Sequence, residues 1–328
     1  MSKLRLAATL GLLLAGSALA QPLTVYSGRN EAFVEPVVES FTAETGLEVE
    51  VRYGDTAELA ATILEEGPNS PADLFLAQDA GALGALAQAG LFTELPTETL
   101  QKVEPRFRSA DGLWVGVTGR ARVLAYNTAA YTPETLPASI FDLTDEAYRG
   151  RVGWAPSNGS FQAFVTAMRE LEGEDRTRAW LEGMLNNDVQ TYSDNSSQLE
   201  ALGRGEIDLG LVNHYYLFQF LAEQGEDFPV RNHFFSDADL GSFVNVAGAG
   251  ILGTTDQPDE AQQFVDFLLS ETAQRHFADN VYEYPLVSSV PASDQLPALS
   301  ELETPDLDLS NIDDLEGTLE LLSEVGAL

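Results

Sequence analysis

Residues 23–51 have the sequence LTVYSGRNEAFVEPVVESFTAETGLEVEV, and this segment indicates the class of fold. Its first residues favour a β-strand, which ends at the turn residues Ser27–Asn30. Apolar residues then recur at helical spacing over 33–41, and Gly46 follows as a typical helix-ending glycine. Residues 47–51 alternate apolar and polar side chains and predict a second strand. The segment therefore predicts a β-α-β unit, the building block of an α/β fold.

The same alternation continues along the chain, which at 328 residues is long enough for two compact domains. A second helix is predicted for residues 56–66. Further strands are predicted at 73–76, 115–117, 122–126, 152–154, 189–192, 207–212 and 243–252. Small or polar residues follow several strands, at the edge where open α/β sheets bind ligands. These junctions are Ser27–Asn30, Gln78–Asp79, Ser157–Ser160, Asp194–Ser196 and Asn213–Tyr216.

The composition excludes several partners and chemistries. The chain has 52 acidic and 17 basic residues, a formal net charge of -35, and no cysteine. Binding to nucleic acid or to an anionic bilayer needs clustered positive charge, so neither partner is expected. Without cysteine, disulfides, thiolate catalysis and cysteine-ligated metal centres are excluded. A metal ion bound to this protein must therefore be held by oxygen or imidazole nitrogen.

The acidic chain is also poor in lysine, because Lys3 and Lys102 are the only lysines among the 17 basic residues. Such a composition resembles that of proteins from salt-rich habitats, where hydrated cations and high ionic strength screen self-repulsion. An ordinary, highly soluble acidic protein is the alternative. Dialysis into salt-free buffer distinguishes the two, since a salt-adapted protein should lose structure there.

The amino terminus has the pattern of a secretory signal peptide. Lys3 and Arg5 precede an apolar run over residues 6–15, and Ala18-Leu19-Ala20 forms a small-residue cleavage site. The run is too short to span a bilayer, and no cysteine follows it for lipid attachment. We therefore expect residues 1–20 to be removed by cleavage after Ala20, leaving a soluble, monomeric periplasmic protein that does not insert into a membrane.

Motifs of common enzyme classes are missing from the chain. It contains no Gly-x-Ser-x-Gly elbow and no phosphate-binding Walker loop. Its three histidines, His214, His233 and His276, show no spacing typical of a catalytic pair. These absences weaken the case for an enzyme without excluding one, and a binding protein that is not an enzyme is the expectation. A secreted hydrolase with a carboxylate pair is the remaining enzymatic alternative, although carboxylate pairs carry little information in so acidic a chain.

Tyr215 and Tyr216 stand at the predicted junction between strand 207–212 and the helix that follows it. Adjacent side chains diverge on a strand and lie about 100° apart on a helix, so neighbouring phenols converge most easily at such a junction. Phenolate oxygen suits a hard trivalent cation, whose charge lowers the tyrosine pKa toward neutral pH. Two aromatics that only pack together are the alternative, and for an isolated tyrosine pair that role is the more frequent one.

Other junctions have the donors that an anion needs. Asn158, Gly159 and Ser160, at a predicted helix start, offer backbone N–H groups and a hydroxyl. Asn195 and Asn213 can donate further hydrogen bonds. Taken singly, each of these residues is more often a helix cap that needs no ligand.

The order of these motifs resembles that of the periplasmic ferric-ion-binding proteins of bacterial iron ABC transporters. The matching stretches run in the family's order over nearly the whole chain after residue 20. They are Val25–Arg29, Glu66–Asp73, Gly119–Arg122, Pro156–Phe161, Asn195–Ser196, Gly205–Asp208, Val212–Tyr216 and Glu283–Leu286. This resemblance favours the interpretation of Tyr215 and Tyr216 as metal ligands.

The resemblance implies an α/β fold of the type II periplasmic binding protein class. Its two lobes, each a mixed sheet flanked by helices, are joined by two crossover hinge strands. The first lobe is expected at residues 22–121 and 246–296, and the second at 122–245 and 297–328. In this family the lobes close on Fe(III) in the cleft and present it to the permease of an ABC transporter. The alternative is a receptor for an oxyanion or small organic solute that needs no metal.

For the site, the resemblance implies that Tyr215 and Tyr216 bind Fe(III) and that a synergistic anion, phosphate or carbonate, completes the coordination. Arg29 matches an anion-facing arginine of a branch that uses carbonate. Another branch holds its anion at the positions of Asn158, Gly159, Ser160, Asn195 and Asn213.

The first lobe departs from the family pattern. Asn30 stands where one branch has a histidine ligand, and Gln78 stands where that branch has a glutamate. Glu31 and Ser160 stand where another branch has tyrosines. Three possibilities stay open: Glu31 ligates as a carboxylate, Asn30 or Gln78 holds a coordinated water, or the metal binds mainly to one lobe and its anion.

Overall fold

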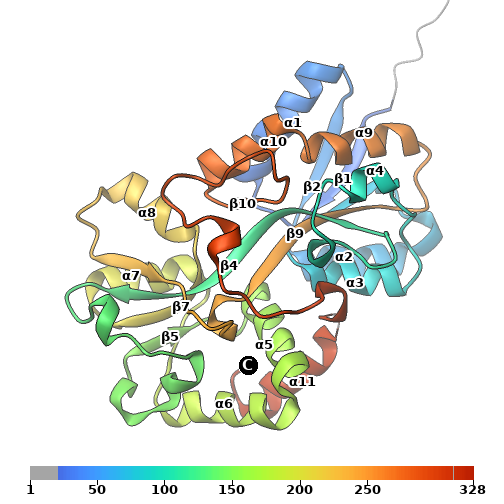
Figure 1. The fold of residues 1–328 in the computed structure, drawn as a ribbon. Helices are drawn as coiled ribbons and strands as arrows, with labels where there is room; N and C mark the ends of the chain where they lie inside the picture. The colour runs from blue at the N-terminus through green and yellow to red at the C-terminus, as the bar shows by residue number, and fades with distance from the viewer. Residues whose placement is uncertain (1–20, 313) are drawn as a thin grey trace, which may run out of the picture.

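The computed structural model describes residues 21–312 and 314–328, which form a mixed α/β structure of two lobes (Figure 1). One ten-stranded sheet runs through the described part in the order β2-β1-β3-β9-β4-β7-β5-β6, while β8 and β10 also pair with β4. The predicted signal peptide, residues 1–20, lies outside the described residues. Among the helices that are described, none is both long and apolar enough to cross a bilayer.

The strands and helices alternate along most of the chain. The strands are β1 (Leu23–Ser27), β2 (Val49–Tyr53), β3 (Leu74–Ala77), β4 (Val115–Asn127), β5 (Val152–Trp154), β6 (Gln190–Thr191), β7 (Leu209–Asn213), β8 (Val230–His233), β9 (Val244–Ile251) and β10 (Tyr284–Pro285). The helices are α1 (Glu31–Thr45), α2 (Thr56–Glu66), α3 (Ala80–Gln88), α4 (Thr97–Leu100), α5 (Gly159–Glu172), α6 (Glu174–Asn186), α7 (Asn195–Arg204), α8 (Tyr216–Gln224), α9 (Pro258–Leu268), α10 (Glu271–His276) and α11 (Leu315–Val325).

The amino-terminal segment forms the predicted β-α-β unit. β1 pairs in parallel with β2 on one side and with β3 on the other. α1 begins after Asn30, whose side chain accepts a backbone hydrogen bond, and it ends at Gly46 with φ of 75°. That φ lies in the left-handed region that glycine adopts without strain. β2 starts at Val49, which pairs with Leu23, and not at residue 47 as predicted.

β4 is the strand that crosses between the lobes (Figure 1). Its residues 115–121 pair with β9, and its residues 122–127 pair with β7 and β8. The sequence predicts two separate strands here, at 115–117 and 122–126, and that prediction is wrong. The intervening residues stay in the sheet because they continue the antiparallel pairing with β9, and all of β4 is buried.

β9 is the second connection between the lobes. It lies antiparallel between β3 and β4, and its residues Val244–Val246 pair with Gly119–Ala121, beside the point where β4 changes partners. β4 and β9 therefore form the pair of strands about which the lobes are joined.

Aromatic side chains fill the core of each lobe. Phe41 of α1 contacts Phe264 of α9 edge to face at a centroid distance of 4.9 Å. In the other lobe, Trp154 contacts Phe161 at 5.5 Å and Trp180 at 6.3 Å. Each such pair adds about 1 kcal/mol beyond the burial of its area. These contacts belong to one buried apolar cluster that includes residues of both lobes.

The carboxy-terminal tail contacts both lobes. Leu309–Asn311 lies against α3, whereas α11 packs on α5 and α6. Two ion pairs hold it to the second lobe: Arg169 to Asp314 at 2.9 Å and Arg178 to Glu324 at 2.7 Å.

Candidate functional site

The tyrosine pair occupies the junction that the sequence predicts. β7 ends at Asn213 and α8 begins at Tyr216, so both phenols stand where the chain turns from strand to helix. Their rings stack at a centroid distance of 4.4 Å and an interplanar angle of 27°. Burial, and then the neighbouring Tyr215, raise the pKa of Tyr216 well above 10. A strongly charged cation is needed to ionise such a phenol near neutral pH.

Three buried arginines surround this pair. Arg29, Arg120 and Arg122 are 4%, 1% and 2% exposed, respectively. The charges of Arg29 and Arg122 interact with both tyrosines, and Arg120 interacts with Tyr216. Burial, and then the like charge of Arg120, lower the pKa of Arg122 to about 9, so it remains protonated at neutral pH. In a chain of net charge -35, this cluster is a local concentration of positive charge.

Several donors of the cluster lack partners in the described part of the chain. None of the three guanidinium nitrogens of Arg120 has a hydrogen-bond partner there, and the same holds for Nη1 of Arg29 and Nδ2 of Asn213. Leaving a buried charged donor unpaired is costly, so native proteins normally satisfy it. The donor set, two guanidinium groups and an amide, suits an oxyanion. The residues present therefore fit an exogenous anion beside the tyrosines.

The structure brings together four of the predicted anion residues on the second lobe. Oδ1 of Asn158 accepts from the backbone N–H of Ser160 at 3.2 Å and from its hydroxyl at 2.6 Å. Nδ2 of Asn195 donates to the same Asn158 oxygen at 3.4 Å, and Oδ1 of Asn195 accepts from the N–H of Asn213 at 3.0 Å. Arg122 donates to the carbonyl of Ser160 at 2.6 Å. This network ties the α5 start to the tyrosine junction.

The first-lobe candidates are placed differently. Asn30 and Glu31 are exposed at the start of α1, and the Asn30 side chain accepts from the N–H of Ala32 at 2.9 Å as the helix cap. Gln78 instead lines a cavity of about 350 Å³. That cavity also contacts Asn158 and Gly159 of the other lobe, and Ile312, Leu315 and Leu319 of the tail. Of the three first-lobe candidates, Gln78 is thus the one that faces predicted anion residues across the cleft.

Comparison with known proteins identifies the family. A family model described as bacterial extracellular solute-binding protein matches residues 69–311. The chain belongs to this family. The Fe(3+)-binding periplasmic protein of Serratia marcescens is 34% identical to this solute-binding protein, with 94% of this chain and 91% of that protein covered. The major ferric iron-binding protein of Neisseria meningitidis serogroup B is 33% identical, with 93% of this chain and 92% of that protein covered.

The fold of the solute-binding protein matches solved structures as well. The crystal structure of iron-bound HitA from Pseudomonas aeruginosa superposes with a TM-score of 0.89 at 37% identity, covering 93% of this chain and 99% of that one. The predicted type II periplasmic binding protein fold and the resemblance to ferric-ion-binding proteins are therefore confirmed.

Sequence reasoning missed Arg120 as a site residue of the solute-binding protein. The residue lies in the matched stretch Gly119–Arg122, yet a break between strands is predicted there. The available signal was the spacing of Arg120 and Arg122, since alternate residues of a strand lie on the same face. Two arginines on one face of an otherwise apolar segment indicate a buried anion site.

Histidine contributes structure to this region. His214 is fully buried; its Nε2 donates to the carbonyl of Tyr282 at 2.7 Å, and its Nδ1 accepts from the N–H of Ala121 at 3.1 Å. Burial lowers the pKa of His214 to about 4, so the ring is neutral. Within residues 21–312 and 314–328, no group of three His, Asp or Glu side chains gathers as a metal site.

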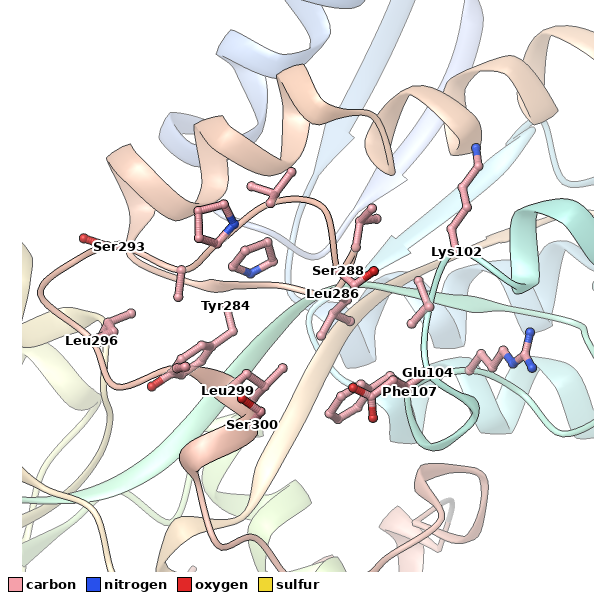
Figure 2. A pocket seen from close by; sticks show the side chains of 18 of the residues that line it. Lys102, Glu104, Phe107, Tyr284, Leu286, Ser288, Ser293, Leu296, Leu299 and Ser300 are labelled. Carbon is pink, nitrogen blue, oxygen red and sulfur yellow. The ribbon is translucent and has the colours of Figure 1, made fainter.

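A further cavity, of about 730 Å³, lies between residues 101–108 and 284–300 (Figure 2). Its wall is of mixed polarity, with Phe107, Leu286, Leu296 and Leu299 beside Lys102, Glu104 and Ser293. Tyr284 lines this cavity, but Tyr215, Tyr216 and the predicted anion residues do not. This cavity is therefore separate from the candidate site.

Proposed function

We propose that this solute-binding protein captures Fe(III) in the cleft between its lobes and delivers it to the permease of an ABC transporter. The phenolates of Tyr215 and Tyr216 bind the metal, and an exogenous anion completes its coordination. One observation carries the proposal: a stacked tyrosine pair stands beside buried guanidinium nitrogens that have no hydrogen-bond partner among the described residues. Relatives named as ferric-iron-binding proteins, and the iron-bound HitA structure, cover nearly the whole chain and support it.

Charge explains why the metal and the anion bind together. Two phenolates neutralise two of the three charges of Fe(III), whereas Arg120 and Arg122 add positive charge and form no ion pair with a carboxylate that the structure describes. The loaded site therefore keeps an excess of positive charge. A di- or trivalent oxyanion such as carbonate or phosphate removes this excess and accepts the free hydrogen bonds.

The remaining predicted residues take supporting roles in this proposal. Arg120, Nη1 of Arg29 and Nδ2 of Asn213 are the principal anion donors. Gly159, with Asn158 and Ser160, offers the start of α5, and Asn195 holds this loop to Asn213. Gln78 faces the metal from the first lobe through a coordinated water when the lobes close. Asn30 and Glu31 are not needed as ligands.

The route of the protein follows from the same proposal. The signal peptide is cleaved after Ala20, and the protein acts as a monomer in the periplasm. It binds metal in an open form, closes about β4 and β9, and presents the closed form to the permease. No enzymatic step is involved.

Metal analysis combined with a visible spectrum tests this function. The protein loaded with Fe(III) and phosphate should show a phenolate-to-iron charge-transfer band, and the double variant Tyr215→Phe/Tyr216→Phe should lose both band and tight binding. Tyr192→Phe, in the second lobe but outside the site, serves as a matched control and should keep both. A colourless wild-type protein that binds an oxyanion without iron would instead support the metal-free receptor.

A further inference from the structure

Arg29 and Glu283 form a buried ion pair next to the candidate site. Nη2 of Arg29 donates to the two carboxylate oxygens of Glu283 at 2.6 and 2.7 Å, and the Thr118 hydroxyl donates to one of them at 2.7 Å. The side chains of Arg29 and Glu283 are 2% and 0% exposed, respectively. The carboxylate is thus held by donors of Arg29 and Thr118.

Arg29 also faces the tyrosines. Its Nη1 has no partner in the described part of the chain, and its charge interacts with Tyr215 and Tyr216. The guanidinium carbon lies 5.9 Å from the ring centre of Phe33, whose ring in turn contacts Tyr215 edge to face at 6.2 Å. Arg29 therefore links Glu283 to the tyrosine pair: its Nη2 is bonded to Glu283, and its Nη1 has no partner among the described residues.

The three arginines of the site are consequently not equivalent. Among the described residues, the guanidinium group of Arg120 has no hydrogen-bond partner, whereas Arg122 donates to the carbonyls of Leu211 and Ser160. Neither of these two forms an ion pair with a carboxylate of residues 21–312 or 314–328, although the charge of Arg120 interacts with Asp79. Of the three, Arg29 alone forms an ion pair with a carboxylate in the described part of the chain, and burying that pair costs desolvation free energy.

We propose that Glu283 is a specificity-determining residue that sets the charge of the anion the site accepts. It touches neither metal nor anion and acts through Arg29: it orients the guanidinium group and cancels its charge, so that Arg29 supplies a directed hydrogen bond without raising the positive potential. This inference rests on the proposed function, because it concerns the anion bound with Fe(III).

The substitution Glu283→Gln separates this role from a structural one. The amide keeps the shape of the side chain but leaves the charge of Arg29 unpaired. The metal-free protein should unfold at a lower temperature, because a buried cation has lost its partner. The phosphate concentration for half-maximal development of the phenolate–iron band should nevertheless fall about tenfold, because the site becomes more positive.

A merely structural role predicts the opposite for binding: a destabilised site would need more phosphate. Asp266→Asn is the matched control. Asp266 also belongs to a first-lobe ion pair, with Lys102 at 2.6 Å, but that pair is partly exposed and outside the site. The same change in net charge there should leave the phosphate requirement unaltered.

A second background keeps the test decisive if Glu283→Gln folds poorly. In Arg29→Gln, the carboxylate is left unpaired and the phosphate requirement should rise. Adding Glu283→Gln to that variant should lower it again, since the negative charge is removed. If neither variant changed the phosphate concentration needed for the band, while the wild type showed a normal band, the role of Glu283 would be overturned and the proposed function would stand. Failure of the wild type to form any band would overturn the proposed function as well.

Discussion

The two walls of the cleft hold their polar residues in different ways. On the second lobe, Asn158, Asn195 and Asn213 are joined by hydrogen bonds to one another and to the turn that carries the tyrosines. On the first lobe, Asn30 caps a helix at the surface and Arg29 is neutralised by Glu283. Side chains that are already fixed by hydrogen bonds lose little conformational entropy when a ligand binds to them. Under the proposed function, we expect the second lobe to receive the metal and anion and the first lobe to complete the site on closure.

Arg120 should give the largest effect, because it lies on the strand shared by both walls. The substitution Arg120→Gln should raise the phosphate requirement of the phenolate–iron band about a hundredfold or more, through the loss of charged hydrogen bonds. It should also stabilise the metal-free protein, because a buried cation without a partner is removed. A band titration and thermal unfolding measure the two effects.

The control for Arg120 is another arginine with a purely structural environment. Arg231 donates to the backbone carbonyls of Glu226, Phe228 and Val230 in the second lobe. Arg231→Gln should lower stability and leave the phosphate requirement unchanged. An unchanged requirement in Arg120→Gln would contradict the anion site.

His214 joins the two walls and makes the metal-free protein sensitive to acid. Its pKa is lowered by burial to about 4, whereas an unfolded chain binds the proton near 6.5. The unfolded state therefore takes up a proton first, and stability falls as the pH falls from about 6.5 to about 4, by about 3 kcal/mol. Urea unfolding at several pH values measures this slope. His214→Gln should show a smaller loss over the same window, and an equal loss would assign the slope to other groups.

Gln78 tests whether the first wall reaches the metal. Gln78→Glu replaces a neutral amide at the cavity by a carboxylate, which suits a hard cation, so the affinity for Fe(III) should rise about tenfold. Competition with a soluble chelator measures the change. Gln78→Met, which adds no charge, is the control for altered packing. Equal affinities in Gln78→Glu and wild type would mean that the metal is bound by the second lobe and anion only.

Asn30 should give the smallest effect, confined to stability. Its side-chain oxygen is engaged as the α1 cap, so Asn30→Ala should cost about 1 kcal/mol of unfolding free energy and leave Fe(III) affinity unchanged. Asn30→Asp preserves a capping oxygen and should restore the stability. A clear loss of affinity in Asn30→Ala would place the residue in the site and weaken the contrast between the walls.

The sequence predicts the second wall better than the first. The tyrosine junction depends on local periodicity, and β7 and α8 meet where that periodicity changes. Asn158 is likewise predictable as the residue before a helix. By contrast, β4 was not predictable as one strand, because residues 118–121, with polar Thr118 and Arg120, interrupt its apolar pattern and the pairing with β9 keeps them in the sheet.

Local chemistry along the chain determined the α/β class, the absence of thiol ligands and the position of the tyrosine pair. These properties depend on composition and on short-range spacing, which a sequence contains in full. The tertiary structure alone decided that Arg120 is buried without a hydrogen-bond partner among the described residues and that Arg29 is paired with Glu283, 254 positions away along the chain. Charge pairing and burial are properties of neighbours in space, and the fold brings those neighbours together from distant strands.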